Sequence, residues 1–526
     1  MIARATWLVL LLALLPRADS LAAGPASQPA PAIRPPNVVL FFIDTLRADH
    51  VHCLGYDRPT TPQLDELARR GTLCTQAIAQ ANESLSSYST LFTSLYPLSH
   101  GVLAGGLALN PRLQTLAGIL RGHGYRTGGF VGGGQIPAES GLGNGFERYW
   151  STSHPGSLMR SVPQALGWLN AQPAADPFFL FVQGYDAHGP YTPPLGFGEL
   201  YDPDYSGIVH QPGFLTLQVM QRVTGNTLGP QVLLEYERSP FGAPGHSGRR
   251  RRLLPPALPG VEVARPSTDS TTLSEPQWRF ARTPGPAGLP ARLPPARICL
   301  TEADVTHLVA HYDGAVTYAD MWLGIFLDSL RERGRLENTL VVVAGDHGES
   351  LGEHERFGHG FGMYESILHV PLVVAGPGVA SGRVVTDVVG LVDVAPTVLE
   401  LCGISPLHTH QGRSLAPYLA ATAPPPSEPG RVAFSYGADR YSIRTARHHL
   451  VFAILPRTGQ LFDPRLHDIL VDPDERHNLA DEQPALVQEL VSRVKDWAEQ
   501  TSQSGQAVPS GLNPSLKEQL RLFGYW

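Results

Sequence analysis

The sequence predicts an α/β protein with a large, mostly parallel sheet sandwiched by helices and a small C-terminal α+β lobe built on an antiparallel sheet. Two observations lead to this prediction. Apolar strands alternate with helical stretches from residue 37 to about 405, a pattern typical of parallel sheets covered on both faces. After residue 425 the chain changes to short strands and turns, followed by one helix.

The individual elements of the main domain follow from hydrophobic periodicity. Apolar, β-branched runs predict strands at 38–43, 127–131, 178–183, 340–344 and 370–374. Apolar residues at helical spacing predict helices at 61–70, 112–123, 304–333 and 393–402. In the first of these helices, Leu64, Leu67 and Ala68 fall on one face. The alternation predicts connections that cross from one strand to the next through a helix.

The C-terminal lobe is predicted from shorter segments. Strands are expected at 432–436, 441–445 and 449–452, followed by Leu461-Phe-Asp463, a turn-rich stretch at 472–479 and a helix at about 482–500. The predicted organisation is a signal peptide at 1–23, a linker at 24–36, a catalytic domain at 37–424 and the lobe at 425–526. Within the catalytic domain, residues 240–298 are rich in Pro, Gly and Arg without hydrophobic periodicity, which predicts a low-complexity insertion.

The N-terminus has the features of a secretory signal. Arg4 provides a positive charge, Trp7 to Leu15 an apolar run, and Ser20-Leu-Ala22 small residues at a cleavage site. The run is too short for a membrane-spanning helix, and no stable span is expected in the mature chain. We therefore expect an exported protein, periplasmic or secreted. There Cys53, Cys74, Cys299 and Cys402 could pair in three ways, or some could be small buried apolar residues.

The amino-acid composition limits the kinds of partner that the protein is expected to bind. The 526 residues are 42% hydrophobic and 17% charged, as in an ordinary globular protein, and the net charge of −7 gives no reason to expect nucleic-acid binding. Of 40 basic residues, only Lys495 and Lys517 are lysines. Any positive charge in a binding site before residue 495 must therefore come from arginine, histidine or a metal ion.

Acidic residues follow two of the predicted strands directly. Asp44 follows Asn37-Val-Val-Leu-Phe-Phe-Ile43, and Asp346-His347 follows Val341-Val-Val-Ala-Gly345. Ligands of open α/β sheets bind at the carboxyl ends of the strands, and carboxylate beside imidazole is a suitable pair of metal ligands. Asp-His-Gly alone could be a helix N-cap; with Asp44 it indicates a metal-centred hydrolase.

These residues are part of a longer pattern that resembles the sulfatase family of the alkaline-phosphatase superfamily. The resemblance extends over essentially the whole mature chain, apart from the insertion. The matching stretches are Pro36 to Asp49, Ser84 to Pro97, Phe178-Phe-Leu, Asp186-Ala-His188-Gly-Pro-Tyr, Gly345-Asp346-His347-Gly-Glu, Gly358-His359-Gly, Val370-Pro371-Leu, Asp393-Val-Ala-Pro396-Thr and Asp472-Pro … Asn478-Leu. Their order and spacing, rather than any single motif, make the resemblance specific.

The resemblance implies one divalent cation held between strand ends. Asp44, Asp346 and His347 match the ligand positions, and in sulfatases the ion is usually Ca²⁺. The histidine also suits Mg²⁺, Mn²⁺ or Zn²⁺. Independently of the family, a hard cation prefers carboxylate oxygens and offsets negative charge on an anionic ester.

The resemblance places the nucleophile at Ser84, nine residues before the Thr of Thr93-Ser-Leu-Tyr-Pro97. Ser84 is expected at a turn into a helix N-terminus, where backbone N–H groups favour a sulfate or phosphate. The alternative is that Ser84, Ser86 or Ser87 caps the helix, which is a common role of serine.

Further site residues are implied by position in the family. His188 and His359 match positions that grip the substrate oxyanion or protonate the leaving group. Asp186 is close enough in sequence to orient or join them, and Arg47 is a candidate contact for the substrate anion, with a surface or salt-bridge role as its alternative.

The chain departs from the family in two places. The standard Cys/Ser-x-Pro-x-Arg motif, whose first residue becomes formylglycine, is replaced by Ser84-Leu-Ser-Ser-Tyr88, which makes formylglycine doubtful. An unmodified serine activated by the metal is the alternative. The two active-site lysines of the family have no counterpart; Phe130 to Gly134, where one would fall, is uncharged.

Three hypotheses follow. The first is an exported metal-dependent hydrolase of sulfate esters or related anionic esters, acting on a small molecule or a glycan. The second is a phosphodiesterase or phosphoryl transferase using unmodified Ser84. The third is a catalytically silent relative that binds sulfated or phosphorylated glycans. The sequence gives neither the alcohol portion of the substrate nor the oligomeric state.

Overall fold

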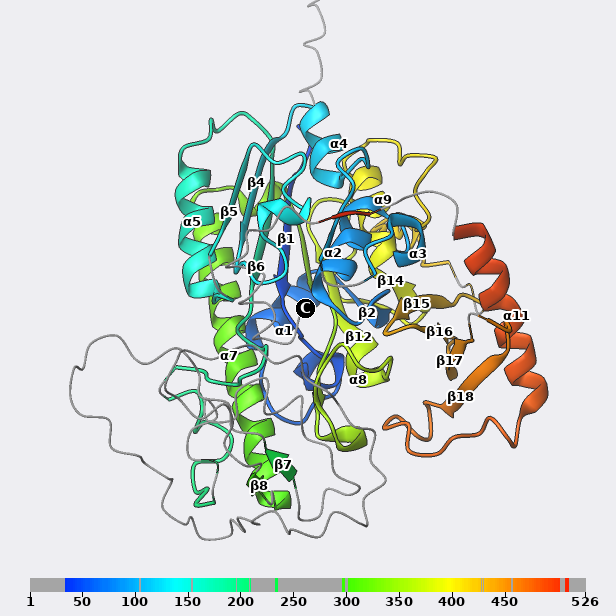
Figure 1. Ribbon diagram of the computed structural model, residues 1–526. Helices are drawn as coiled ribbons and strands as arrows, with labels where there is room; N and C mark the ends of the chain where they lie inside the picture. The colour runs from blue at the N-terminus through cyan, green and yellow to red at the C-terminus, as the bar shows by residue number, and fades with distance from the viewer. Residues whose placement is uncertain are drawn as a thin grey trace, which may run out of the picture. The chain divides into compact units, whose positions relative to one another are not determined.

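The computed structural model of the protein is built around one large sheet (Figure 1). It describes residues 34–103, 106–152, 155–194, 196–207, 209, 232–234, 296–298, 301–426, 428, 430–455, 457–501 and 507–509. The sheet has the strand order β13-β2-β12-β9-β1-β6-β4-β5, with β14 also pairing with β2. These strands are β1 Asn37–Ile43, β2 Thr72–Ile78, β4 Arg126–Val131, β5 Arg148–Ser151, β6 Phe178–Gly184, β9 Thr339–Gly345, β12 His369–Ala375, β13 Arg383–Val385 and β14 Val389–Gly390.

Strand β1 lies at the centre of this sheet and is buried along its whole length. It pairs in parallel with β6 on one side and with β9 on the other. Ile43, its last residue, is level with Gly184 of β6 and with Gly345 of β9. The residues that follow all three strands therefore emerge at one edge of the sheet.

Helices cover both faces, as predicted. Alternate residues of β1 point to opposite sides, so Val39, Phe41 and Ile43 pack in one core, and Val38, Leu40 and Phe42 in the other. The first core includes α1 Pro62–Arg70, α5 Leu158–Asn170 and α7 Glu302–Glu332; the second includes α2 Ser84–Thr93, α4 Leu116–Gly122 and α9 Val394–Leu401. Three further short helices in the described residues are α3 Pro97–His100, α8 Glu365–Leu368 and α10 Ala416–Leu419.

The predicted fold class is confirmed, with several differences in detail. Strand β12 is antiparallel to both of its neighbours, β2 and β9. Helix α4 begins at Leu116, because the Thr115 side chain accepts a hydrogen bond from Gly118 N and caps it there. Strands β2, β5, β13 and β14 were not predicted, since their polar or very short segments lack a clear apolar period. Helix α5 was also missed, although its apolar residues have helical spacing; it contains Pro163, which is unusual inside a helix.

The C-terminal lobe is an antiparallel sheet packed against one helix. Its strands are β15 Ala433–Gly437, β16 Arg440–Arg444, β17 His448–Ile454 and β18 Leu461–Asp468, and its helix is α11 Pro484–Thr501. The lobe is joined to the main domain through β15: Ser435 Oγ donates to Ala79 O and Tyr436 N donates to Gln80 O. The short strands β3 Leu107–Ala108 and β19 Val508–Pro509 pair with each other, as do β10 Ser350–Leu351 and β11 Phe357–Gly358.

Several predictions concern segments outside the described residues. The signal peptide and most of the linker fall in residues 1–33, and nearly all of the insertion at 240–298 falls between 235 and 295. At its end, β8 Ala296–Ile298 pairs with β7 Val232–Leu234. Cys53, Cys74 and Cys402 are free thiols, whereas Cys299 is not described. No helix in the described ranges is both long and apolar enough to cross a membrane.

A buried ion pair connects the lobe to the main domain. Arg444 of β16 is 2% exposed and forms two bonds with Glu365 of α8, Nε to Oε1 at 2.6 Å and Nη2 to Oε2 at 3.3 Å. Burial alone would raise the pKa of Glu365, but Arg444 and the neighbouring His449 and His369 hold it below its ordinary value. The pair therefore stabilises the fold where Glu365 is ionised.

We expect Arg444→Ala to lower the free energy of unfolding by about 3–5 kcal/mol at neutral pH, because the buried Glu365 carboxylate loses its arginine and keeps only the more distant His449 and His369. Urea unfolding followed by circular dichroism measures this change. The folded-state pKa of Glu365 is lowered, so the difference from the wild type should shrink as the pH falls and Glu365 protonates. Arg447→Ala, which removes a guanidinium that is 62% exposed and pairs with Asp468, is the control and should change little. Equal effects of the two substitutions would contradict the prediction.

Candidate active site

The carboxyl ends of β1 and β9 bring the predicted metal ligands together. Asp44, Asp346 and His347 each offer one ligand atom, and these atoms lie within 4.8 Å of one another. All three side chains are fully buried. The level register of β1 and β9 makes this meeting unavoidable, because Asp44 and Asp346 are the first residues after paired strand ends. The two aspartates are 302 residues apart in the sequence, and the pairing of β1 with β9 brings them together.

The two aspartates each have one oxygen held by protein groups and one without a partner. Asp346 Oδ1 accepts from Thr45 N at 3.1 Å and from His347 N at 2.9 Å. Asp44 Oδ2 accepts from Gln183 Nε2 at 3.0 Å and from Ser84 Oγ at 3.3 Å. Asp44 Oδ1 and Asp346 Oδ2 have no hydrogen-bond partner within the described part of the chain. Buried oxygens without partners are costly, and a bound cation would satisfy them.

Electrostatics also favour a cation here. Burial, reinforced by the negative charges of Asp346 and Glu349, raises the pKa of Asp44 well above its ordinary value, and the hydrogen bonds from Ser84 and Gln183 oppose this only in part. His347 Nδ1 faces Gly348 O at 2.9 Å, so the proton belongs on that nitrogen and Nε2 carries the lone pair. The donor set of two carboxylates and one imidazole fits a divalent cation.

Ser84 lies beside this group at the first turn of α2. Its Oγ is 3.2 Å from His347 Nε2 and 3.3 Å from Asp44 Oδ2. The capping alternative is wrong for Ser84, because Glu83 is the N-cap residue and the Ser84 hydroxyl faces the acid–histidine group. Ser87 Oγ instead donates to Asp346 O at 2.6 Å and fixes α2 to the end of β9.

A second group of buried ligand-type residues is formed by His188, Glu349 and His359. Their ligand atoms also lie within 4.8 Å of one another. Within this second group, the His359 ring is the one that contacts the first group. Its centroid is 4.4 Å from that of His347 and 5.0 Å from that of His188. The two predicted histidines therefore do meet near Ser84, together with a glutamate.

Arg47 is placed elsewhere than its predicted role requires. Its guanidinium pairs with Asp49 at 2.6 Å and Glu353 at 2.8 Å, and donates to Glu349 O at 2.9 Å. The side chain is 4% exposed, so these contacts hold it inside the protein. The contacts favour the salt-bridge alternative and a function in bracing the backbone of Glu349.

Asp186 is also turned away from the ligand groups. Its carboxylate accepts from Ser157 Oγ and from Leu158 N at 2.8 Å, at the beginning of α5. Burial raises the pKa of Asp186 to about 6, against the opposing effect of those hydrogen bonds. Asp186 thus fixes α5 to the loop that carries His188, and contacts no histidine of the site in the described structure.

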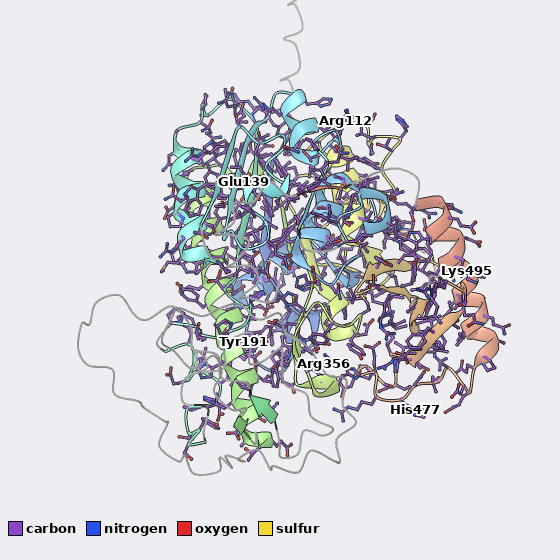
Figure 2. All side chains as sticks on the ribbon, viewed as in Figure 1. Arg112, Glu139, Tyr191, Arg356, His477 and Lys495 are labelled. Atoms are coloured by element: carbon purple, nitrogen blue, oxygen red, sulfur yellow. The ribbon has the colours of Figure 1, made fainter. Side chains whose placement is uncertain are left out.

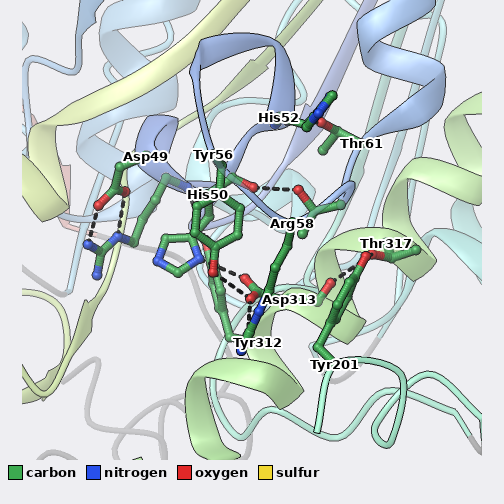
Figure 3. Close-up of polar contacts among 12 residues, drawn as sticks. Asp49, His50, His52, Tyr56, Arg58, Thr61, Tyr201, Tyr312, Asp313 and Thr317 are labelled. Carbon is green, nitrogen blue, oxygen red and sulfur yellow. Dashed lines mark hydrogen bonds and ion pairs between the residues drawn. The ribbon is translucent and has the colours of Figure 1, made fainter. Parts of the chain in front are cut away.

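The loop that follows Asp44 is tied to helix α7 through Asp313 (Figure 3). Asp313 Oδ1 is 2.7 Å from His50 Nδ1, while Oδ2 accepts from Tyr56 OH and Arg58 Nη1, both at 2.7 Å. Tyr312, the preceding residue, donates to Thr45 O at 2.8 Å. Thr45 has φ +55°, an unusual value for a β-branched residue, and the contacts around it hold this conformation.

Sequence reasoning missed three polar residues of the site. Gln183, near the end of β6, donates a hydrogen bond from Nε2 to Asp44 and accepts one at Oε1 from Gly132 N at 2.9 Å. Gln135 Oε1 accepts from Leu85 N at 3.1 Å at the start of α2. Glu349 follows Asp346 by three residues. A polar residue inside an otherwise apolar strand was the available signal for Gln183; for Gln135 the sequence has none.

No lysine reaches this region in the part of the chain that is described. Lys495, the single lysine there, lies on the outer helix α11 of the lobe (Figure 2). Within the described ranges no arginine or lysine forms an ion pair with Asp44, Asp346 or Glu349. The local charge at the strand ends is therefore set by carboxylates and histidines.

The fold and the site define an α/β protein with a buried carboxylate–histidine centre beside a serine on a helix N-terminus. The chain belongs to the sulfatase family, since the model of that family matches residues 36–404. A second model, described as N-sulphoglucosamine sulphohydrolase, C-terminal, matches residues 352–503. The predicted family is thus confirmed.

The chain is also similar to individual proteins, in sequence over part of its length or in fold. The chain is 31% identical to arylsulfatase K of Xenopus laevis over 207 residues, which cover 37% of the chain and only 38% of that relative. A phosphonate monoester hydrolase of Agrobacterium radiobacter has the same fold, with a TM-score of 0.61, 20% identity, and coverage of 89% of this chain and 96% of that one. So has a protein solved with its substrate D-glucosamine-2-N,6-O-disulfate, with a TM-score of 0.62, 17% identity, and coverage of 91% and 100%.

We expect a divalent cation to raise the melting temperature of the metal-free protein, because binding to the folded state alone stabilises it by about 2.7 kcal/mol at a hundredfold excess over Kd. Differential scanning calorimetry with added Ca²⁺, Mg²⁺, Mn²⁺ or Zn²⁺ measures the shift. Asp346→Asn should reduce it, whereas Asp320→Asn, at a buried carboxylate on α7 that bonds Gln63 N and Leu64 N, should leave it intact. An unchanged shift in Asp346→Asn would remove Asp346 from the ligand set.

Proposed function

We propose that this protein is a metal-dependent hydrolase of sulfate esters that uses Ser84 as its nucleophile. The observation that carries the proposal is the position of Ser84 Oγ, within 3.3 Å of both Asp44 and His347 at the N-terminus of α2. Membership of the sulfatase family supports the reaction class. The substrate would be a small molecule or a glycan that carries an anionic ester.

Asp44, Asp346 and His347 would hold the cation, and Ser84 lies close enough to join them. A bound divalent cation would favour the ionised form of the Ser84 hydroxyl and offset the charge of the ester. Ca²⁺ is the expected ion by family, while His347 also suits Mg²⁺, Mn²⁺ or Zn²⁺.

Ser84 Oγ would attack sulfur in line with the departing alcohol, forming the new S–O bond as the ester S–O bond breaks. The N-terminus of α2 would favour the negative oxygens of the attacked group, although one of its first N–H groups, that of Leu85, already donates to Gln135 Oε1. Water would then release sulfate from the enzyme. Asp346 and Gln183, through their contacts with Thr45 and Asp44, keep the site in this geometry.

His188 and His359 are assigned to the substrate side of the site. Burial lowers the pKa of His188 to about 4 and that of His359 well below its ordinary value, aided in each case by neighbouring histidines. Both rings are therefore neutral at neutral pH before substrate binds. An anionic ester placed beside them would raise these pKa values and allow a ring to protonate the leaving oxygen.

A phosphate or phosphonate ester is the second candidate substrate. Two features favour it: the chain lacks the Pro and Arg that accompany formylglycine, and no lysine is available for the sulfate group. An unmodified serine next to a divalent cation is a nucleophile suited to phosphoryl transfer. The fold shared with a phosphonate monoester hydrolase is compatible with this chemistry.

We also propose that the protein is exported, to the periplasm or outside the cell. The support is the charged, apolar and small-residue order of the first 22 residues. Fractionation of cells that produce the full chain, with N-terminal sequencing of the mature form, tests the cleavage near Ala22.

We expect Ser84→Ala to lower turnover of the preferred ester by at least about a thousandfold, because it removes the attacking oxygen. Assays with 4-nitrophenyl sulfate, 4-nitrophenyl phosphate and bis-(4-nitrophenyl) phosphate measure this for each added cation. Ser86→Ala is the matched control: Ser86 lies on the same helix, its hydroxyl has no partner in the described structure, and its loss should have little effect.

The outcomes separate the hypotheses. Preference for the sulfate supports the first proposal, and preference for a phosphate ester supports the second. Absence of turnover with every ester and cation would favour a silent, glycan-binding relative. Mass spectrometry of the peptide containing Ser84 shows whether it has lost two hydrogen atoms to become formylglycine.

A further inference from the structure

We propose that His307 and His311, on helix α7, bind a divalent transition-metal ion outside the active site. The ligand atoms are the Nε2 nitrogens of the two rings, and residues 196–207, in the segment after β6, hold the rings in place. Neither histidine belongs to the two ligand groups at the strand ends. The inference therefore goes beyond the proposed function and does not rest on it.

The helix itself brings the two rings together. His307 and His311 lie in the N-terminal half of α7, the long green helix of Figure 1, and are four residues apart, so they share one face of the helix. Their Nε2 atoms are 3.0 Å apart. Two nitrogens that are each about 2.0–2.1 Å from one metal ion lie about 3.0–3.4 Å from each other. The observed separation therefore suits a shared ion.

Without a metal, the two nitrogens share a proton in an N–H···N hydrogen bond. His307 Nδ1 is 2.9 Å from Asp202 Oδ2, which places the His307 proton on Nδ1 and its lone pair on Nε2. His311 then donates from Nε2, and its Nδ1 has no hydrogen-bond partner within the described residues. Since no described group requires a proton or a lone pair at that Nδ1, His311 can change tautomer. It then offers its Nε2 lone pair to a metal and loses only this one hydrogen bond.

His307 has the outer support that metal-binding histidines receive in proteins. Asp202 accepts from its Nδ1, which is the carboxylate–histidine arrangement that orients a ring toward a metal. Tyr205 stacks on the ring, with centroids 3.7 Å apart and planes at 11°, and its hydroxyl donates to Asp304 of the same helix. The side chain of His307 is 7% exposed, so these contacts fix the direction of its Nε2 lone pair.

His311 is enclosed by the same segment of the chain. It is 8% exposed, and a Cβ added at Gly198 would lie 2.7 Å from its Cε1 atom, so the backbone packs directly on the ring. Burial and the neighbouring His307 lower the pKa of His311 to about 4, against the opposing effect of Glu199 and Asp202. The His311 ring is therefore neutral at neutral pH, which is the form that binds metal, and the two acids favour a cation.

The ligand type narrows the ion to Zn²⁺, Cu²⁺ or Ni²⁺. Imidazole nitrogens suit these ions, whereas Ca²⁺ and Mg²⁺ prefer oxygen ligands. The described residues provide no third ligand atom within 4.8 Å of both nitrogens, so water completes the coordination of the ion and binding is reversible. A bound cation makes the Nδ1–H group of His307 a stronger donor to Asp202. Occupation of the site should therefore hold residues 196–207 more firmly against α7.

The first test counts the ions bound by the full chain. Purified protein is stripped with a chelator, dialysed to equilibrium against increasing concentrations of Zn²⁺ and analysed by inductively coupled plasma mass spectrometry. We expect His307→Gln and His311→Gln to bind one equivalent fewer than the wild type, whatever number the strand ends bind. Asp202→Asn should keep this equivalent but weaken its affinity about 10–100-fold. His448→Gln, at a partly exposed histidine of β17, is the control and should bind as many ions as the wild type.

Hydrogen exchange followed by mass spectrometry locates the effect in the chain. We expect Zn²⁺ to slow exchange in peptides covering 196–207 and the start of α7 in the wild type but not in His311→Gln. Peptides around Asp346 and His359 report on the strand ends separately. Circular dichroism shows whether each variant is folded, and the exchange of the wild type decides the matter if a variant is not.

Equal numbers of bound ions in the wild type and in both histidine variants overturn the inference, as does exchange in 196–207 that Zn²⁺ leaves unchanged. A loss of one equivalent in His448→Gln as well would mean adventitious surface binding and would also overturn it. Ester hydrolysis is a separate measurement: turnover without the α7 site leaves the proposed function standing, and an α7 site without turnover of any ester leaves only this inference standing.

Discussion

The rest of the structure depends on one constraint: the parallel strands β1, β6 and β9 end at the same position along the sheet. Ile43 of β1 pairs with Gly184 of β6 and Gly345 of β9. Asp44, the His188 loop and Asp346-His347 therefore leave the sheet side by side, although they are far apart in the chain. A shift of any one strand by a single residue would reverse its inward and outward faces as well as displace its ligand, so the two packed cores fix the site.

Buried negative charge is the main energetic problem of this arrangement. The interior holds Asp44, Asp346 and Glu349 together, at a depth where carboxylates are stable only with hydrogen bonds, cations or protons. Backbone N–H groups and Gln183 satisfy one side of Asp346 and Asp44, and the other side is left for a ligand. The same negative charge would favour a bound cation.

The polar supports around the site are spread over many elements. Arg47 braces the Glu349 backbone, Asp186 fixes α5, and Asp313 of α7 holds the loop after β1. In the sequence, Arg47 and Asp186 were candidates for binding substrate, whereas Asp313 was not singled out. Their contacts show that they act on the backbone that carries the ligands, since an ion pair or a helix cap already occupies each charge.

The sequence by itself determined the α/β class, five central strands of the main sheet and the strands and helix of the lobe, and it predicted the site residues Asp44, Ser84, His188, Asp346, His347 and His359. The elements follow from local apolar patterns, and Asp44, Asp346 and His347 from apolar runs that end in acidic residues. Ser84, His188 and His359 were implied by the resemblance to the sulfatase family. Tertiary structure decided the antiparallel direction of β12, the partners of Arg47 and Asp186, and the entry of Gln183, Gln135 and Glu349 into the site. Those depend on strand register and on which side chains meet across the sheet. Of these features, only Gln183, a polar residue in an apolar strand, leaves a mark in the local sequence.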